Sequence, residues 1–309
     1  MAESLPPRYS GLLLVHKPSG ITSHDLVAQA RRIFQTKEVG HAGTLDPLAS
    51  GLMVLLLGQA TKLSSYIMEG DKSYSVEVLL GKRTDALDVT GQVLEENEVL
   101  ESQIQNIPNE VAKLSGDFEW PVPMYSAVKV GGQKLYEMAR QNKVIETPQK
   151  TMSFWNVELK TEPALTFWVD LECSKGSFIR TWVDQLGNHM GCGACVKSLI
   201  RTGSKPYSLD QTRSLEETQD LLDRGEKLPH FIPMGKALPF MKKARVQIFD
   251  QTLLMNGQIS HDLRRLLISL VNPEENTLIQ AVSMKGGALL AIIAYEKGLG
   301  FKIRRVFPL

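Results

Sequence analysis

The stretch GHAGTLDPLASGLM, residues 40–53, holds a single acidic residue, Asp46, among small residues and a proline. Two interpretations fit a lone carboxylate in such a loop. In the first, Asp46 caps a helix or closes an Asx-turn, which is common beside proline. In the second it is mounted for catalysis: three glycines allow close approach of backbone or ligand, Pro47 fixes the chain direction, and the apolar run 52–57 supplies a rigid strand. The rigid mounting favours the second interpretation.

Arg180 is another residue whose position indicates a function. It lies in the segment 177–190, SFIRTWVDQLGNHM, whose apolar residues have helical spacing. Arg180 falls in the first turn, where the helix macrodipole disfavours a cation. An exposed arginine is the simplest alternative, but the unfavourable position indicates a dedicated partner for the guanidinium.

The cysteines allow one further kind of chemistry. His189, Cys192 and Cys195 lie three residues apart, and with Cys173 they could supply four zinc ligands. A plain helix end with Gly turns explains the same run, LGNHMGCGACVKSLI, and the second C-x-x-C pair of a zinc site is missing. We therefore expect no metal site. Three cysteines without a disulfide-like framework fit the reducing cytosol.

The elements that must position these residues alternate between strands and helices. Residues 11–15 read as a buried strand, and Ser23 is a good N-cap for a helix that follows. Residues 52–57 predict a strand buried on both faces, and 61–69 a short helix. Tyr74 opens the alternating run 74–80, which is typical of a strand with one covered face.

The second half of the chain continues the mixed pattern. The segment 83–91 is rich in turns, and 100–114 is helix-like with an early break at Pro108. The remaining expected elements are a short helix at 134–141, strands at 153–159 and 165–173, a helix at 214–225, an irregular connection at 227–240, and strands at 245–249, 277–284 and 288–295. The last three strands indicate a small β-rich domain over 241–309.

Composition limits the class of protein without naming a substrate. The chain has 309 residues, 43% hydrophobic and 22% charged, which is enough for a large core and more than one domain. The net charge of +1 gives no overall positive field that would indicate a nucleic-acid partner. Residues 1–10 lack a basic and apolar export segment, and no apolar run approaches about 20 residues, so we expect neither export nor a membrane.

Several blocks together resemble one family, the TruB-type tRNA pseudouridine synthases. The resemblance covers about residues 10–210 in order, and GTLDPLASG is its most specific motif. The final segment, with GGALLAIIAY and RRVFPL, is similar to the small PUA-like RNA-binding module that often ends such chains. The matching blocks are KPSGITSHD at 17–25, GHAGTLDPLASGL at 40–52, DKSYSVEVLLG at 71–81, TDALDVTG at 84–91, PMYSAVKVGG at 123–132, YEMAR at 136–140, CSKGSFIRTWVDQLG at 173–187 and GCGACVKSLIR at 191–201.

The resemblance implies a fold and a reaction. The fold is α+β: a mixed, mostly antiparallel sheet in a catalytic domain over 10–240, followed by the PUA-like domain over 241–309. The reaction isomerises uridine to pseudouridine at position 55 in the T-loop of tRNA. It moves the C1′ bond from N1 to C5 of the base without oxidation, reduction or hydrolysis, so no cofactor is expected.

The family's catalytic positions fall on Asp46, Arg180 and Tyr74. Asp46 is the carboxylate that attacks the base or the sugar, or that stabilises charge at C1′. Arg180 keeps such a carboxylate ionised, since a guanidinium can bind it through two hydrogen bonds. Tyr74, which could otherwise be a core aromatic, stacks on the target base. A free tyrosine pKa near ~10 makes it a poor base, so stacking is the better supported role.

Three more positions match residues that contact the substrate. Phe178, where many relatives have tyrosine, and Leu199 line the uridine pocket, although either could be a plain core residue. His41 matches the position that contacts the displaced loop nucleotides, although a histidine beside glycine is often a turn residue. The target base lies in a folded tRNA loop, so it must be flipped out, at a cost of a few kcal/mol. The expected partner is therefore the T-arm stem-loop of tRNA.

The chain departs from the family pattern at a few positions. His16 stands where an aspartate is usual, which puts a local salt bridge in doubt; Ala86 replaces a threonine, and Val122 interrupts a proline pair. The family pattern also implies that Lys17, with Pro18, orders the loop beneath the site. Basic residues that could meet phosphates, or could be a solvated face, are Lys242, Lys243, Arg245, Lys302, Arg304 and Arg305.

Two alternatives belong to other classes. An RNA-binding module or tRNA-folding chaperone would keep the fold and lose catalysis, but the intact Asp46, Tyr74 and Arg180 argue against it. A guide-RNA-dependent relative tends to carry a long basic tail, which this chain lacks. We expect a cytoplasmic enzyme that acts as a monomer on its asymmetric RNA substrate.

Overall fold

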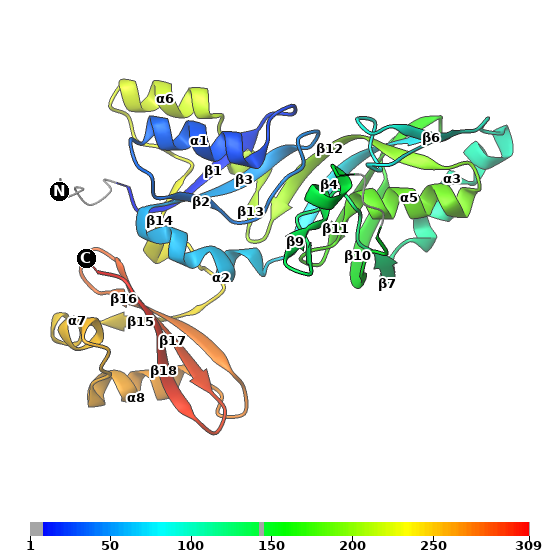
Figure 1. Ribbon diagram of the computed structural model, residues 1–309. Helices are drawn as coiled ribbons and strands as arrows, with labels where there is room; N and C mark the ends of the chain where they lie inside the picture. The colour runs from blue at the N-terminus through cyan, green and yellow to red at the C-terminus, as the bar shows by residue number, and fades with distance from the viewer. Residues whose placement is uncertain (1–8, 142–144, 309) are drawn as a thin grey trace.

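The computed structural model describes residues 9–141 and 145–308 (Figure 1). The expectation for residues 1–10 therefore falls mostly outside the described part of the chain, as does Leu309 at the end of the predicted RNA-binding module. No helix within the described ranges is long and apolar enough to cross a membrane.

One large sheet runs through the first three quarters of the chain. Its strands are β1 (Gly11–Lys17), β2 (Val39–His41), β3 (Ser50–Leu57), β4 (Lys72–Leu80), β7 (Gly116–Pro121), β10 (Gln149–Leu159), β11 (Thr166–Cys173), β12 (Ala194–Ser204), β13 (Tyr207–Ser208) and β14 (Phe231–Pro233). In the described residues their order is β14–β1–β3–β12–β4–β11–β10–β7, with β13 beside β12 and β2 beside β3. The β3–β12 pair is parallel and the other neighbours are antiparallel, as expected for a mixed, mostly antiparallel sheet.

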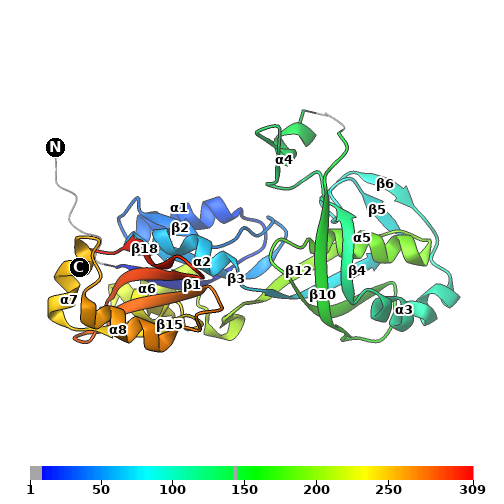
Figure 2. The same cartoon turned by 90° about the horizontal axis from the view of Figure 1, so that it is seen from below.

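Helices and short connections complete this part of the chain. They are α1 (Ser23–Ile33), η1 (Gly58–Leu63), α2 (Ser64–Met68), β5 (Lys82–Thr84), β6 (Val93–Glu96), α3 (Glu101–Lys113), β8 (Lys129–Val130), β9 (Gln133–Lys134), α4 (Leu135–Ala139), α5 (Ile179–Met190), η2 (Leu209–Gln211), α6 (Leu215–Asp223) and η3 (Met234–Lys236). The segment with β8, β9 and α4 stands away from the rest of the molecule (Figure 2).

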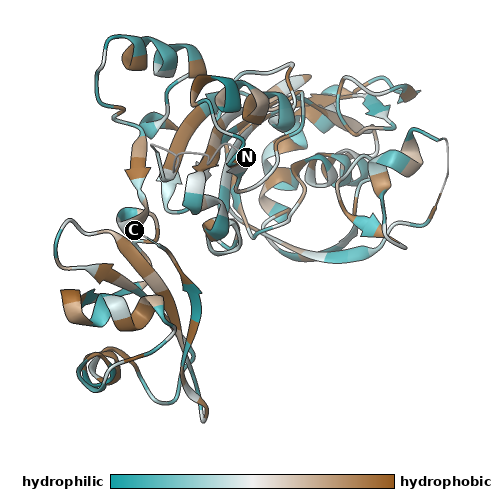
Figure 3. Ribbon diagram, turned by 60° about the vertical axis from the view of Figure 1, so that its left-hand side comes forward, coloured by the Kyte–Doolittle hydropathy of each residue, from teal (hydrophilic) through white to brown (hydrophobic). Residues whose placement is uncertain are grey.

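The strand β3 is buried on both faces, as predicted. Leu13 and Leu55 contribute to a core shared with α1, α3 and α5, whereas Leu12 and Leu56 point to the opposite side of the sheet. Figure 3 shows hydrophobic residues concentrated along the strands. The parallel pairing with β12 requires a glycine at position 51, where φ is +103° and an added Cβ would lie 2.4 Å from a backbone oxygen.

Three sequence predictions need local correction. The N-cap of α1 is Thr22, one residue before Ser23, and it forms a capping box with Asp25. Pro108 does not break α3, which continues to Lys113; the proline is exposed, so water can satisfy the carbonyl that loses its donor. The run after His189 is not a helix end alone, because it continues into the long central strand β12.

The C-terminal segment forms a second sheet. It contains β15 (Lys242–Val246), α7 (Ile248–Met255), α8 (His261–Leu270), β16 (Thr277–Ser283), β17 (Leu289–Glu296) and β18 (Gly300–Val306). The strand predicted over 245–249 ends at Val246, and α7 begins at Ile248, which is 78% exposed. The apolar Ile248 and Phe249 led to the prediction of a strand, but they are exposed side chains of this helix.

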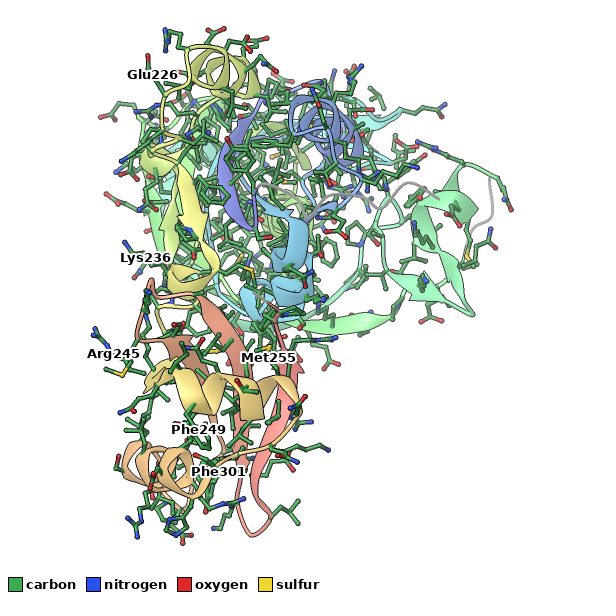
Figure 4. The ribbon with its side chains drawn as sticks, turned by 90° about the vertical axis from the view of Figure 1, so that its left-hand side faces the viewer. Glu226, Lys236, Arg245, Phe249, Met255 and Phe301 are labelled. Atoms are coloured by element: carbon green, nitrogen blue, oxygen red, sulfur yellow. The ribbon has the colours of Figure 1, made fainter. Side chains whose placement is uncertain are left out.

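The second sheet does not stand apart from the first. Val282, Ile292 and Phe307 share a buried cluster with Leu12 and Leu56 of the large sheet. In Figure 1 this segment lies against the end of the molecule that carries β14 and α2. Figure 4 shows Lys236 where the two parts meet, with Arg245 and Phe249 on the C-terminal segment. The two parts are thus joined by a continuous apolar core.

Candidate active site

The loop that carries Asp46, between β2 and β3, is fixed on both sides of the aspartate. The buried Ser23 hydroxyl donates to the Leu45 carbonyl at 2.9 Å and accepts from the Leu45 amide at 2.8 Å. On the other side, Lys17 Nζ donates to the Pro47 carbonyl at 3.3 Å. None of these bonds uses the carboxylate of Asp46, so the backbone position of Asp46 does not depend on its own charge.

Asp46 and Arg180 form an ion pair. Arg180 Nε lies 2.8 Å from Asp46 Oδ2. The two remaining guanidinium nitrogens donate to the carbonyls of Ala86 (2.9 Å) and Tyr125 (2.7 Å). Every nitrogen of the group is therefore engaged, which fixes its orientation at the start of α5. Asp46 is thus the partner that the unfavourable position of Arg180 indicated.

The two members of this pair differ in exposure. The Arg180 side chain is 6% exposed and the Asp46 side chain 38%. The cation is enclosed by protein, whereas part of the carboxylate faces outward. A bound molecule can therefore reach Asp46 while Arg180 holds it from behind.

Tyr74 lies within electrostatic range of Asp46. It stands on β4, opposite Arg201 of β12 and Leu171 of β11. Burial raises the pKa of the Tyr74 phenol; the Arg201 guanidinium opposes this shift, and the negative charge of Asp46 adds to it. The phenol is therefore protonated near neutral pH, which makes it a donor rather than a general base.

Phe178, Leu199 and His41 lie on elements next to this group, and no direct polar contact joins them to Asp46 in the described ranges. Phe178 is the N-cap of α5, two residues before Arg180, and Lys150 Nζ lies 5.9 Å from the centre of its ring. Leu199 is buried on β12, on the same face as Tyr74.

His41 ends β2, and its Nδ1 is buried without a hydrogen-bond partner in the part of the chain that the structure describes. Burial lowers the pKa of the imidazole, and the charges of His24 and Arg201 act in the same direction. A backbone hydrogen bond with Gly43 opposes this shift.

Sequence reasoning missed two residues of the site. Tyr125 orients Arg180 through its carbonyl, and its hydroxyl donates to Asp85 at 3.0 Å. Arg201 lies beneath the Asp46 loop. Tyr125 contributes a backbone atom, so its side-chain type gave no signal, and Arg201 lies on β12, a strand that the sequence analysis did not predict.

The departures from the family pattern have local explanations. Ala86 serves Arg180 through its carbonyl, so the missing threonine side chain does not affect this contact. The amide of Val122 donates to the Pro148 carbonyl at 3.0 Å, a bond that a proline at this position could not make. His16 is exposed on β1, outside the buried site.

Lys17 is fully buried beneath the loop. Its ammonium donates to the carbonyls of Pro18 (2.9 Å) and Ile21 (2.7 Å) in addition to Pro47. Burial lowers its pKa to about 8, while Asp46 opposes the shift. Lys17 therefore joins the segment after β1 to the Asp46 loop through hydrogen bonds, which is the position that the family pattern implied.

Lys17→Met is expected to change how stability depends on pH. Between pH 8 and pH 10.5 the unfolded chain binds more protons at Lys17 than the folded chain, so this group's contribution to the free energy of unfolding rises with pH in that window. The wild type should gain on the order of 3 kcal/mol relative to Lys17→Met across it. Urea unfolding at several pH values measures the difference. Lys160→Met, at an exposed lysine, is the control; parallel curves for the wild type and Lys17→Met would contradict the assignment.

The zinc alternative has no support from the described residues. Cys173, Cys192 and Cys195 are buried free thiols. Within residues 9–141 and 145–308, no three His, Cys, Asp or Glu side chains gather in a way that could hold a metal ion. Burial raises the pKa of Cys173 to about 12, so its thiol is protonated.

Comparisons with known proteins show which chains this one is similar to. Residues 31–179 match the family model described as TruB family pseudouridylate synthase (N terminal domain). A protein from Bdellovibrio bacteriovorus named tRNA pseudouridine synthase B is 50% identical over 300 residues, which cover 97% of each chain. A protein of the same name from Bacillus licheniformis is 40% identical and covers 76% of this chain and 78% of the relative.

Solved structures show the same fold at lower identity. A Cbf5-Nop10-Gar1 complex contains a chain with a TM-score of 0.70 and 20% identity, covering 96% of this chain and 85% of that chain. An H/ACA RNP bound to a substrate RNA containing 2′-deoxyuridine contains one with a TM-score of 0.69 and 19% identity, covering 97% and 85%. These likenesses confirm the predicted α+β fold.

Proposed function

The chain belongs to the TruB family of pseudouridylate synthases, which makes it an isomerase, and on this premise we propose that it converts uridine 55 in the T-loop of tRNA to pseudouridine with Asp46 as the catalytic carboxylate. One observation carries the residue assignment. Asp46 is held by Arg180 at 2.8 Å and is nevertheless 38% exposed. A carboxylate that is both oriented and accessible is what a nucleophile requires.

The reaction needs little beyond a held carboxylate and an enclosed base. The bond between N1 and C1′ breaks, the uracil turns, and a bond forms between C5 and C1′; the C5 proton leaves and N1 gains one. Attack of Asp46 on the base or the sugar, or stabilisation of positive charge at C1′, would each serve this sequence. The Arg180 guanidinium would orient the carboxylate in all three routes.

The other site residues would handle the flipped base. Tyr74, with its protonated phenol, supports stacking or hydrogen-bond donation to the base in preference to proton removal. Phe178 and Leu199 would line the uridine pocket. His41, which ends β2 just before the Asp46 loop, would contact the nucleotides displaced from the tRNA loop. These contacts would offset the few kcal/mol that base flipping costs.

Incubation of the purified protein with an unmodified tRNA transcript, followed by mapping of pseudouridine, tests the proposal. We expect a single new pseudouridine at position 55. Binding without product would support the RNA-chaperone alternative. Product at another position would retain the isomerase and refute the T-loop assignment. A minimal T-arm stem-loop should also be modified if it carries the recognition elements.

The C-terminal segment would extend the RNA-binding surface. A pocket of about 580 Å³ lies where it meets the large-sheet part, lined by Lys62 of η1 and by Lys302, Arg304 and Arg305 of β18. Arg304 pairs with Glu296, so Lys62, Lys302 and Arg305 remain to meet phosphates. The basic residues of β15 are also exposed. One of them, Lys243, already donates a hydrogen bond from Nζ to the Gly235 carbonyl.

Lys62→Gln combined with Arg305→Gln is expected to weaken tRNA binding without altering the chemical step. If each cation contacts one phosphate, the slope of log K against log salt should become less steep by about two. Filter binding over a range of salt concentrations measures it. The control is Lys297→Gln, which removes a cation paired with Glu274 at 2.6 Å. An unchanged slope would contradict the pocket's role. Point variants are preferable to deletion of 241–309, because deletion would expose the shared core.

We further propose that the protein acts as a monomer in the cytoplasm. Its three buried cysteine thiols fit a reducing compartment. Size-exclusion chromatography of the protein with and without tRNA would test the oligomeric state.

A further inference from the structure

Arg201 is a buried cation that the proposed reaction does not use. It lies on β12 and is 1% exposed. Within residues 9–141 and 145–308, no carboxylate lies within 4.0 Å of its guanidinium, whereas Arg180 has Asp46. Burying a charge without a counter-ion is unfavourable, and apolar residues of similar volume often replace such groups without loss of stability. The fold alone therefore gives no reason for an arginine here.

The guanidinium contacts the segments that carry Asp46 and the strand behind it. Nε donates to the Leu52 carbonyl at 2.7 Å, and Nη1 to the Thr44 carbonyl at 3.3 Å. Nη2 lies 3.1 Å from Met53 Sδ. Thr44 precedes Asp46 by two residues, while Leu52 and Met53 belong to β3. One side chain therefore spans the loop and the strand that supports it.

The same guanidinium lies close enough to the Tyr74 phenol to oppose the rise in its pKa. In the sheet, Arg201 is paired with Tyr74 of β4 on one side and with Gly51 of β3 on the other. Because position 51 has no side chain, the β12 backbone approaches β3 closely enough to place Arg201 under the loop. Arg201 is thus the bridge between the strand of Tyr74 and the loop of Asp46.

Electrostatics point to the same location. Tyr74 and Lys17 each respond to the charge of Asp46 and to the charge of Arg201. The cation therefore contributes positive potential to the region that holds Tyr74, Lys17 and Asp46.

We propose that Arg201 is a positioning residue that holds the Asp46 loop in a fixed relation to the strand that carries Tyr74. The inference rests on the proposed function, since it assigns both groups to one active site. Lysine is not equivalent at this position, because a single ammonium cannot reproduce a planar fork that meets several acceptors in different directions. Methionine fills a similar space and makes none of these bonds.

Arg201→Met and Arg201→Lys provide the test, with Val78→Ala as control. Val78 is completely buried on β4, away from the loop. For both Arg201 variants we expect a single-turnover rate that falls about 10- to 100-fold, because small misplacements of reacting groups have effects of this size. The dissociation constant for tRNA should stay within about twofold, and Tm should fall by a few degrees for Arg201→Met, because the Leu52 and Thr44 carbonyls lose a donor. Val78→Ala should lower Tm and leave the rate of the folded protein unchanged.

Two further readouts separate positioning from general support of the fold. In a double-mutant cycle with Tyr74→Phe, the losses should be less than additive, because the two residues are paired across β12 and β4 and both changes disturb the placement of the phenol relative to Asp46. Hydrogen exchange in residues 42–49 should accelerate in Arg201→Met, while exchange in α5 should not. This second readout does not depend on activity, so it tests the inference even if the wild type forms no pseudouridine, an outcome that would overturn the proposed function alone.

The inference would be overturned by any of three results. The first is a wild-type single-turnover rate in Arg201→Met. The second is a rate loss that follows the loss of folded protein, as for a core variant. The third is unchanged exchange in residues 42–49.

Discussion

Asp46→Asn is expected to abolish pseudouridine formation while preserving the fold and the affinity for tRNA. The amide has nearly the same shape as the carboxylate, but it is neither nucleophilic nor able to stabilise positive charge at C1′. Loss of such a group typically lowers the rate by on the order of a thousandfold or more. Single-turnover measurement of pseudouridine, with tRNA in slight deficit, would quantify the loss.

The loop should survive this substitution. Ser23 and Lys17 fix the backbone on either side of Asp46, and the amide oxygen can still accept the hydrogen bond from Arg180. We therefore expect Tm to change by no more than a few degrees. Asp170→Asn is a matched control, because Asp170 is similarly exposed at 43% and lies on β11, facing away from Tyr74. A substantially active Asp46→Asn protein would refute the role assigned to this residue.

Arg180→Ala should reduce activity nearly as much. The substitution leaves Asp46 without its counter-ion and removes the donor from the carbonyls of Ala86 and Tyr125. We expect a rate at least about a hundredfold lower, because the carboxylate is no longer oriented. Stability should fall by about 2 kcal/mol; the partial exposure of Asp46 keeps this below the usual cost of breaking a buried pair.

The stability loss makes a control necessary. Arg83 forms ion pairs with Asp184 of α5 at 3.2 Å and with Glu95 at 3.2 Å, so Arg83→Ala removes a comparable set of bonds near the same helix. It should lower stability with little effect on the rate. Arg180→Lys adds a second comparison, since it keeps a charge but not the three-point attachment. An Arg180→Ala rate close to that of the wild type, measured where the protein is folded, would contradict the account.

Sequence patterns located the elements near Asp46 well, because their signals are local. The apolar run at 52–57 and the alternation from Tyr74 onward each predicted a strand, and both strands are found in the large sheet as β3 and β4. The strand β12 was missed because Gly191 and Gly193 interrupt the alternation just where the strand begins. The helix α7 was missed because its exposed Ile248 and Phe249 suggested a buried strand.

The chemistry of the site was only partly accessible from sequence. Asp46 and Arg180 could be named because each stands in an unusual local setting and in a recognisable motif. Tyr125 and Arg201 act through contacts with residues far away in the chain, and one of these contacts uses a carbonyl that any residue possesses. Only the folded sheet brings β12 next to the loop before β3.

The core shared by the C-terminal segment and the large sheet was also not accessible from sequence. Composition indicated a separate small β-rich domain over 241–309, and a second sheet is present there. Residues of β16 and β17 contribute both to a core within the C-terminal segment and to the core shared with the large sheet. The sequence could not show which core a given residue joins, because burial in either one produces the same apolar pattern.

The most direct test is the structure of Asp46→Asn bound to a T-arm stem-loop of tRNA. The account predicts that uridine 55 is flipped out of the loop, with its ring against Tyr74 and its glycosidic bond beside residue 46, which remains in contact with Arg180. A uridine that stays stacked in the loop, or one that binds elsewhere while residue 46 faces solvent, would contradict the central claim.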